Sequence, residues 1–428
     1  MTARELTFNL LLKAESSKQY SNIALDNALQ KSELSTADKN LVSAIFYGVT
    51  ERRITLDYQI KSLSNRPIEE IDVIALIALR IGLYQLIYLT RIPHHAAINE
   101  SVSLAPKKSS GFVNALLRSY LRRGDLALPS KSDTVEYLSV CYSVATPLVK
   151  KFISIFGDNE TKELLSVINN STPTTLRINT LLTDKEAMIK EIPNAIPTKN
   201  APYGILVHGS VRELYGFNDG LFFVQDEASQ ICVEALDACE GDFVMDICAC
   251  PGSKSFGAAI NMKNNGKIMA FDLHENKLSL VTSSAKRLKI DVISTLAQDG
   301  RRPINELFGK ADRIICDVPC SGFGVLAKKP ELRYKSPEES ISLPKIQSDI
   351  LENACKYLKV GGTLIYSTCT ILPEENENNI NNFLLRHSEF SLEPWRVGNV
   401  YAENGMITLL PHVHDTDGFF IAKLKRNF

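Results

Sequence analysis

The 428-residue sequence lacks the marks of several classes of protein. Its nine cysteines include no Cys-x-x-Cys pair, and no cysteine has the histidine spacing that is typical of zinc sites. We therefore expect neither a disulfide framework nor a metal site. The first ten residues, MTARELTFNL, carry an acidic residue where a signal peptide needs an apolar core. Together these absences predict a protein of the reducing cytoplasm.

Long apolar runs and an excess of charge are also missing. The longest apolar run, residues 73–89, is interrupted by Arg80 and Gln85, and it is slightly shorter than the roughly 20 residues that span a bilayer. We expect a buried core helix there and no membrane partner. The net charge of −1 argues neither for nor against nucleic acid.

One local stretch departs from this balance. No acidic residue lies between Glu100 and Asp125, whereas basic residues are frequent there. The ordinary interpretation is a solvated helix face, and the alternative is a face that contacts phosphates. The candidate phosphate contacts are Lys107, Lys108, Arg118, Arg122 and Arg123.

Three patterns of hydrophobicity divide the chain. Residues 1–135 repeat apolar positions at helical spacing and predict an all-α bundle. Residues 140–235 are mixed and predict a small α/β subdomain. Residues 236–428 alternate strand and helix patterns, which predicts a parallel, doubly wound α/β sheet with helices on both faces.

Unusual residues gather where the strands of the last domain are predicted to end. In doubly wound sheets, ligands bind outside the carboxyl ends of the strands. A single strand that ends in Asp or Gly is ordinary, but five successive strands with such ends indicate a site. The five ends are Asp246 to Lys254, Asp272, Asp299, Asp317 to Gly322, and Thr368–Cys369.

The first of these ends, DICACPGSKS, resembles a nucleotide-binding turn but is not a phosphate loop. That loop needs glycine at the positions of Ser253 and Cys248. A turn into a helix still offers free amides to a carboxylate, while Asp272 suits ribose hydroxyls and Asp299 suits an adenine amino group. The combination predicts a nucleoside cofactor that carries a carboxylate and no pyrophosphate, namely S-adenosylmethionine.

Two cysteines, Cys320 and Cys369, follow predicted strands in similar settings. Carbon 5 of a pyrimidine is a poor nucleophile, but a thiolate that adds to carbon 6 makes it reactive toward a methyl donor. Asp317 lies three residues before Cys320 and would hold the base. A second thiol would assist release, and the base would have to be unpaired or flipped.

Several blocks resemble a known family, the RNA cytosine-C5 methyltransferases. The blocks are DICACPGSKS, AFDLHENKL, DVPCSGFGV, YSTCTILPEEN, GLFFVQDEASQ and DGFFIAKL. IGLYQLIYLTRIPHHAAINESV and GFVNALLRSYLRR are similar to its bacterial branch with a NusB-like helical domain, the RsmB (Sun/Fmu) type, which methylates 16S rRNA. The resemblance covers nearly the whole chain and implies a class I, Rossmann-like methyltransferase fold.

The resemblance also implies roles for single residues. Cys369 matches the nucleophile, Cys320 the cysteine linked to product release, and Asp317 the acid that contacts the base beside the cofactor. With RNA as the substrate, the basic residues named above become candidate RNA contacts. The positions that match cofactor contacts are Cys248, Ala249, Cys250, Pro251, Gly252, Ser253, Lys254, Asp272, Lys277, Asp299 and Asp317.

The sequence departs from the family pattern in the cofactor loop and before the α/β domain. Cys250, Ser253 and Ser255 stand where the family has Ala, Gly and Thr. Ser253 matters most, because glycine permits a backbone geometry and a close approach that serine resists, and the change would weaken cofactor binding. CYSVATPLVKKF lacks the His-Pro and Trp that often precede the α/β domain in the family.

Alternatives to a monomeric 16S rRNA enzyme stay open. The same chemistry on 23S rRNA or tRNA differs only in its substrate, and a NusB-like domain alone would suit a non-catalytic, antitermination-like RNA-binding protein. A DNA cytosine methyltransferase would fit the Pro-Cys block, which by itself nominates Cys320 as the nucleophile. Cys369, the RNA-type loop and the helical domain argue against it.

Overall fold

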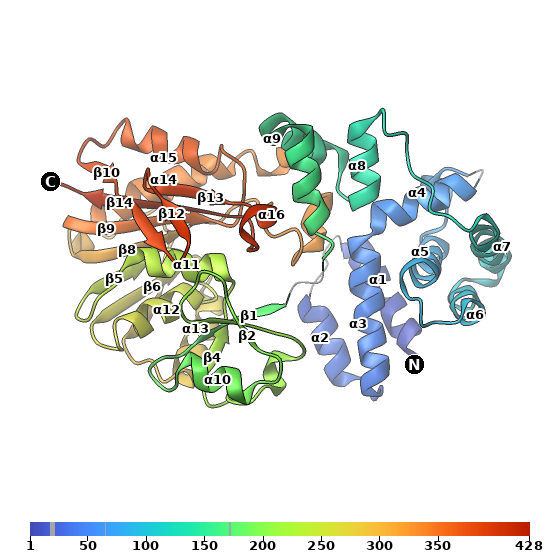
Figure 1. Ribbon diagram of the computed structural model, residues 1–428, viewed down its shortest axis with the longest axis horizontal. Helices are drawn as coiled ribbons and strands as arrows, with labels where there is room; N and C mark the ends of the chain where they lie inside the picture. Colours follow the sequence, from blue (N-terminus) through green and yellow to red (C-terminus); the bar gives the residue numbers. More distant parts are fainter. Residues whose placement is uncertain (18–21, 65, 171–172) are drawn as a thin grey trace. The chain divides into compact units, whose positions relative to one another are not determined.

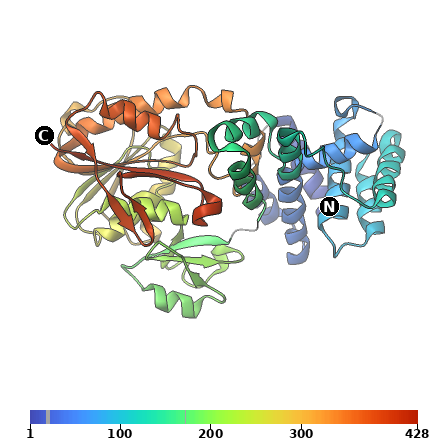
Figure 2. The ribbon, with the colours of Figure 1, turned by 45° about the horizontal axis from the view of Figure 1, so that its top comes forward.

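The computed structural model describes residues 1–17, 22–64, 66–170 and 173–428. The chain forms two compact units. The first contains Met1–Asn169 and a short later segment, Leu326–Pro337. The second contains Asn170–Val325 and Glu338–Phe428. The first unit is built from helices and the second contains the sheets, as Figures 1 and 2 show.

The helical unit has a buried apolar core. Its helices are α1 (Ala3–Ser17), α2 (Asn22–Lys31), α3 (Thr36–Glu51), α4 (Arg53–Leu63), α5 (Val73–Tyr88), α6 (His94–Leu104), α7 (Lys107–Arg123), α8 (Thr134–Tyr142) and α9 (Thr146–Val167). Helix α5 is apolar on all sides, which is typical of a core helix. Its one buried cation, Arg80, is paired with Asp57 at 2.7 Å and with Glu15 at 3.2 Å.

The predicted core helix is therefore confirmed. Within the described ranges, no single helix is both long and apolar enough to cross a membrane. The bent pair formed by α8 and α9 meets those criteria of length and composition only when its two helices are taken together.

The helical unit extends further along the chain than the pattern predicted. We placed the end of the bundle near residue 135 and expected an α/β subdomain from residue 140, but α8 and α9 belong to the helical unit. Helix α9 buries Phe152 before a break and Leu164 after it. The break is at Gly157, whose φ of +79° is not helical. This interruption divides the apolar period into two pieces that are each too short to predict a long helix.

A segment from inside the predicted catalytic domain also belongs to the helical unit. Leu326–Pro337 includes a short 3-10 turn, η4 (Pro330–Tyr334), and Arg333, whose side chain is fully buried. Its guanidinium donates to four acceptors of the same unit. These are the carbonyls of Leu326 (2.9 Å), Glu51 (3.1 Å) and Ile168 (2.7 Å), and Oδ1 of Asn169 (2.7 Å).

Replacing this guanidinium is expected to destabilise the helical unit strongly. Arg333→Ala leaves the carbonyls of Leu326 and Ile168, in buried hydrogen bonds, and the partly buried carbonyl of Glu51 without their donor. Each unsatisfied buried group costs about 1–3 kcal/mol. We expect a loss of about 3 kcal/mol or more in the free energy of unfolding, measured by urea denaturation. Arg302→Ala is the control, because that side chain is 83% exposed. Equal midpoints for the two variants would contradict the structural role of Arg333.

The second unit begins with a small antiparallel sheet of strand order β2-β3-β1-β4. Its elements are β1 (Thr174–Ile178), α10 (Lys185–Glu191), β2 (Ile196–Pro197), β3 (Gly204–Val207) and β4 (Phe222–Val224). Residues such as Leu176, Ile205 and Phe222 form its own apolar core together with Met188 of α10.

The main sheet of the second unit is doubly wound, as predicted. Its order is β10-β14-β9-β8-β5-β6-β7, with β13 paired to β14. The strands β5 to β9 run parallel, and β14 is antiparallel to β9. The strands are β5 (Phe243–Asp246), β6 (Lys267–Asp272), β7 (Ile293–Ala297), β8 (Ala311–Asp317), β9 (Leu358–Thr368), β10 (Phe390–Leu392), β13 (Met406–Leu409) and β14 (Phe419–Arg426), and a separate ribbon pairs β11 (Trp395–Val397) with β12 (Val400–Ala402).

Adjacent residues of the central strands enter different cores, which shows that both faces of the sheet are covered. Ile315 packs in one core and Ile314 in the other, and Ile365 and Leu364 divide in the same way. Helices α11 (Glu227–Leu236), α12 (Ser253–Asn261) and α13 (Glu275–Arg287) contribute to the first core. Helices α14 (Leu343–Tyr357) and α15 (Glu377–Leu384) contribute to the second.

Candidate active site

The parallel strands place four acids and two thiols at one edge of the main sheet. Strand β5 pairs with β6 on one side and with β8 on the other, so the strand order reverses there. Ligands bind outside the carboxyl ends of strands at such a point. The residues at these ends are Asp246 on β5, Asp272 on β6, Asp299 after β7, Asp317 and Cys320 after β8, and Cys369 after β9.

The two cysteines singled out from the sequence lie against each other. The Sγ atoms of Cys320 and Cys369 are 3.0 Å apart. The hydrogen bond with Cys369, together with burial, raises the pKa of Cys320 well above its usual range. Cys320 therefore keeps its proton at neutral pH, and its sulfur lies within hydrogen-bond distance of the sulfur of Cys369.

The loops that carry the two thiols are joined by hydrogen bonds that the sequence did not predict. The hydroxyls of Ser321 and Thr370 are 2.7 Å apart, and the amide of Ser321 donates to Oε2 of Glu375 at 3.0 Å. Glu375 is buried and also accepts from Gln347 at 2.7 Å. The motif PEEN alone gave no signal for this role, because the burial of Glu375 is evident only from the structure.

Two glycines bring a third segment against the same loops. The amide of Gly324 donates to the carbonyl of Cys369 at 3.0 Å, and the amide of Gly418 donates to the carbonyl of Gly324 at 2.8 Å. A Cβ added to Gly324 would lie 1.9 Å from the carbonyl oxygen of Gly418. Only glycine permits this approach, and the thiol of Cys369 is thereby held beside that of Cys320.

A buried ion pair lies next to the thiols. Nζ of Lys254 is 2.7 Å from Oδ2 of Asp317, and the hydroxyl of Ser367 donates to Oδ1 of Asp317 at 2.8 Å. Burial works to lower the pKa of Lys254, but Asp317 outweighs it and the pKa is raised. Lys254 is therefore charged, and it orients the carboxylate of Asp317.

The ion pair forms one wall of a cavity of about 50 Å³. Most of the predicted cofactor loop lines the same cavity. The lining residues are Asp246, Cys248, Ala249, Cys250, Pro251, Ser253, Lys254 and Asp317. The cavity thus brings together the first and fourth strand ends of the set that the sequence predicted.

The carboxyl of Asp246 at the end of β5 is the most deeply buried acid of this cavity. Its Oδ2 accepts from the hydroxyl of Ser255 at 2.6 Å, and its Oδ1 has no hydrogen-bond partner within the described part of the chain. Burial raises the pKa of Asp246 to about 7. The unpaired oxygen leaves a buried acceptor available to a donor that enters the cavity.

Asp246→Asn is expected to change the pH dependence of stability. From about pH 4 to pH 7 the native state holds the proton of Asp246 while the unfolded state has lost it, so stability falls through this group as the pH rises. Asparagine cannot ionise. The free energy of unfolding of the variant should therefore rise relative to that of the parent between pH 5 and pH 8. Urea titrations of both proteins test this, and parallel curves would contradict it.

The serine in the cofactor loop does not impose the strain that the sequence suggested. Gly252, one residue earlier, has the left-handed φ of +107° and precedes helix α12. Ser253 is the first residue of that helix and has no positive φ. The glycine that stands at this position in the family is therefore not required by backbone geometry, and the free amides at the start of α12 remain accessible beside Ser253.

Four of the predicted cofactor residues do not line the cavity, namely Gly252, Asp272, Lys277 and Asp299. Oδ2 of Asp272 accepts from the amide of Cys250 at 3.3 Å and so shapes the loop. The carboxylate of Asp299 is paired with Arg301 at 2.8 Å, and the hydrogen bond with Arg301 lowers the pKa of Asp299. Lys277 lies exposed on α13.

Comparison with known proteins decides the family. A relative from Bacillus subtilis (strain 168), named probable ribosomal RNA small subunit methyltransferase B, is 34% identical over 99% of both chains. A relative of the same name from Synechocystis sp. is 34% identical over the full length of both. The family model described as 16S rRNA methyltransferase RsmB/F matches residues 233–425. The chain belongs to the RsmB/F family.

The helical unit and the fold agree with this membership. The model of the NusB family matches residues 1–122 of this RsmB/F methyltransferase. Among solved structures, PH0851 is 27% identical with a TM-score of 0.78, and the match covers 94% of this chain and 93% of that one. The structure of NSun6 from Pyrococcus horikoshii with SFG, 22% identical with a TM-score of 0.60 over 66% of this chain and 98% of that one, shares the fold. Membership of this family supports S-adenosylmethionine as the cofactor.

The basic residues of α7 in this RsmB/F member differ in their exposure and in their hydrogen-bond partners. Lys107, Lys108, Arg118 and Arg122 are exposed. Arg123 is engaged by its own fold, because its guanidinium donates to Gln59 at 2.6 Å and to Ser62 at 2.8 Å. Charge spacing alone cannot separate an arginine that packs against a neighbouring helix from one that faces solvent.

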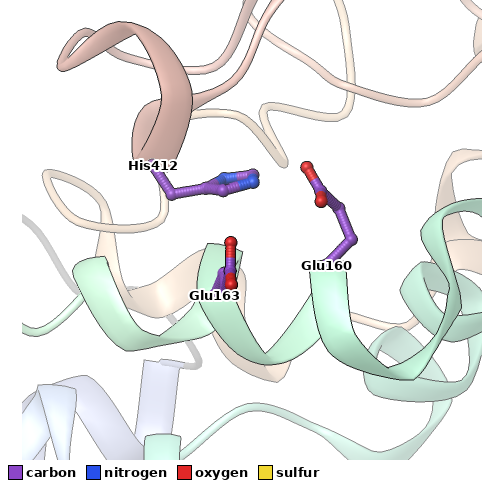
Figure 3. A group of neighbouring side chains, drawn as sticks. All are labelled: Glu160, Glu163 and His412. Carbon is purple, nitrogen blue, oxygen red and sulfur yellow. The ribbon is translucent and has the colours of Figure 1, made fainter.

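We assign no metal site to this RsmB/F member. Glu160 and Glu163 lie on consecutive turns of α9, and His412 lies on α16 (Pro411–His414), as Figure 3 shows. Helix α9 belongs to the helical unit and α16 to the other unit. The three residues therefore do not form a group within one compact unit, and they carry no argument about function.

Proposed function

We propose that the chain transfers a methyl group to carbon 5 of a cytosine in 16S rRNA, through a covalent bond between Cys369 and carbon 6 of the base. The observation that carries this proposal is the 3.0 Å separation of the Cys320 and Cys369 sulfurs beside Asp317. A non-catalytic RNA-binding protein has no chemical need for two adjacent thiols. The arrangement therefore favours an enzyme over an antitermination-like protein.

The two thiols suit opposite halves of the reaction. The thiolate of Cys369 adds to carbon 6, and the electron pair of the carbon 5–carbon 6 double bond becomes available at carbon 5 for the methyl group. Loss of the carbon 5 proton then restores the double bond and expels the thiolate, so one methyl replaces one proton. Cys320, which keeps its proton, donates a hydrogen bond to the sulfur of Cys369 before attack and on departure.

Asp317 is proposed to hold the cytosine. Lys254 and Ser367 fix its carboxylate through bonds of 2.7 and 2.8 Å. A carboxylate accepts hydrogen bonds from the exocyclic amine of cytosine, and this contact separates cytosine from uracil, which presents a carbonyl there. Because a base inside a helix cannot reach these groups, the target must be unpaired or flipped.

The first strand ends fit S-adenosylmethionine, which supplies the methyl group. The amides at the start of α12, after Gly252, suit its carboxylate. The unpaired Oδ1 of Asp246 is a buried acceptor for its ammonium group. Asp272 remains our proposal for the ribose hydroxyls, and Asp299 and Lys277 for the adenosine end. The pairing of Asp299 with Arg301 means that Asp299 would hold adenosine only with Arg301 at its side.

The assignment of 16S rRNA as the substrate rests on the names of the relatives and on the exposed positive charges of α7. Relatives over the full length are named for the ribosomal RNA small subunit. The exposed cations Lys107, Lys108, Arg118 and Arg122 on α7 are proposed phosphate contacts. The same chemistry on 23S rRNA or tRNA is the competing assignment.

Bisulfite sequencing tests the substrate directly. In a strain that lacks the gene, one cytosine of 16S rRNA should lose its protection against conversion, while 23S rRNA and tRNA keep theirs. The purified full chain and S-adenosylmethionine should restore protection at that position in vitro. A lost mark in tRNA or 23S rRNA alone would replace 16S rRNA as the substrate, and no lost mark in any RNA would overturn the proposed function.

A further inference from the structure

A cleft of about 270 Å³ lies on the helical unit, and no residue discussed as catalytic lines it. One wall is the end of α4 with Leu63, Ser64 and Arg66, and the other is α7. Its volume is close to the roughly 300 Å³ at which small-molecule sites begin. The α7 residues that line it are Phe112, Ala115, Leu116 and Ser119.

Two of the lining side chains offer flat surfaces. The guanidinium of Arg66 lies over the ring of Phe112 at 5.4 Å from the ring centre. Arg66 is exposed and Phe112 is half-buried, so neither is sealed within the core. Aromatic rings and arginine planes are the groups on which unpaired bases stack in RNA-binding proteins.

The same face of α7 carries cations beyond both ends of the cleft. Lys108, Phe112, Ala115, Ser119 and Arg122 follow one another at intervals of three and four residues, so they form one stripe along the helix. Arg122 also donates to the hydroxyl of Ser119 at 2.6 Å, which joins the cation to the cleft wall. At 1.5 Å per residue, the stripe from Lys108 to Arg122 is about 21 Å long.

The charges around the cleft favour an anionic ligand. No acid lies within residues 101–124. The carboxylates of Glu69 and Glu70 follow Arg66 closely in sequence but do not line the cleft. An acidic protein segment would satisfy the charge but would not use a stacking surface, whereas a polynucleotide uses both.

We propose that this cleft binds an unpaired nucleobase of the RNA substrate, stacked on Phe112 and Arg66, while Lys108 and Arg122 contact the flanking phosphates. The inference rests on the proposed function, because it takes RNA as the substrate. It adds a second base-binding site, separate from the one that receives the target cytosine. The base would stack inside the cleft, and the phosphates would be neutralised at its two ends.

The test separates stacking from charge. The full chain is titrated with a fluorescein-labelled single-stranded RNA at several salt concentrations. Phe112→Leu keeps an apolar side chain but removes the ring, and about tenfold weaker binding with an unchanged salt slope is expected. Phe112→Trp should bind at least as tightly as the parent. Arg122→Gln should reduce the salt slope by about one contact, whereas Lys162→Gln, an exposed lysine on α9, should not.

A photocrosslink locates the base. RNA that contains 4-thiouridine should crosslink to the peptide that carries Phe112, and this adduct should be lost in Phe112→Leu. Unchanged RNA affinity in Phe112→Leu would overturn the inference. So would normal binding of free RNA with lost binding of intact small ribosomal subunits, because the cleft would then take a protein. RNA binding as predicted without any cytosine methylation would overturn the proposed function and leave the cleft site standing.

Discussion

A Cys369→Ala variant is expected to lose methyl transfer by about a thousandfold or more while it keeps its fold. The proposed reaction depends on a thiolate that adds to carbon 6, and removal of a covalent nucleophile eliminates the route rather than slowing one step of it. Single-turnover transfer of labelled methyl groups to small-subunit rRNA measures the loss. RNA affinity should change little, because the proposed phosphate contacts lie on α7 of the helical unit, whereas Cys369 belongs to the other unit.

The control must remove a thiol without touching the site. Cys239 is exposed, and its sulfur donates to the backbone carbonyl of Asp237, two residues away, so Cys239→Ala should be fully active. Cys369→Ser is informative in addition, because serine preserves the size but is a far weaker nucleophile at neutral pH. Normal activity in either Cys369 variant would remove this residue from the role of nucleophile and refute the proposed reaction.

The sheet and its edge were predictable because they depend on local order. The strand from Ala311 to Asp317 and the strand from Leu358 to Thr368 are buried on both faces. Such strands read as short apolar runs, and these runs alternate with helical patterns along the sequence. Once the strands are parallel, their carboxyl ends meet. That rule places Cys320 and Cys369 at the same edge of the sheet, and the pairing of β8 with β9 in the structure brings them together.

Side-chain contacts, whether between distant segments or within one turn, were not predictable in this way. From the sequence, Arg333 would be expected to be an exposed charged residue of a loop. In the structure it is buried and donates to carbonyls of α3 and of the end of α9. Asp299 reads as a ligand at a strand end, yet Arg301, two residues later, holds its carboxylate. Burial and pairing depend on which segment covers a side chain, and periodicity carries no information about that.

A Cys320→Ala variant is expected to accumulate a stable covalent complex with RNA. The sulfur of Cys320 lies 3.0 Å from that of Cys369, and as the proposed donor it would stabilise the Cys369 sulfur as it departs. Without this donor, the bond between Cys369 and carbon 6 should still form, and the methyl group should still transfer once. Release should slow until turnover stops near one methyl group per enzyme. Denaturing electrophoresis with labelled RNA measures the complex.

The double variant identifies the sulfur that holds the RNA. In Cys320→Ala/Cys369→Ala the complex should vanish, because the carbon–sulfur bond requires Cys369. Survival of the complex in the double variant would place the bond on another residue, and rapid turnover by Cys320→Ala would show that release needs no second thiol. Reversing the roles is a third distinct result: if Cys369→Ala trapped the RNA and Cys320→Ala were inert, the thiol of the Pro-Cys block would be the nucleophile. The outcomes differ in which of the two single variants and the double variant retain labelled RNA, so one gel with all three variants distinguishes them.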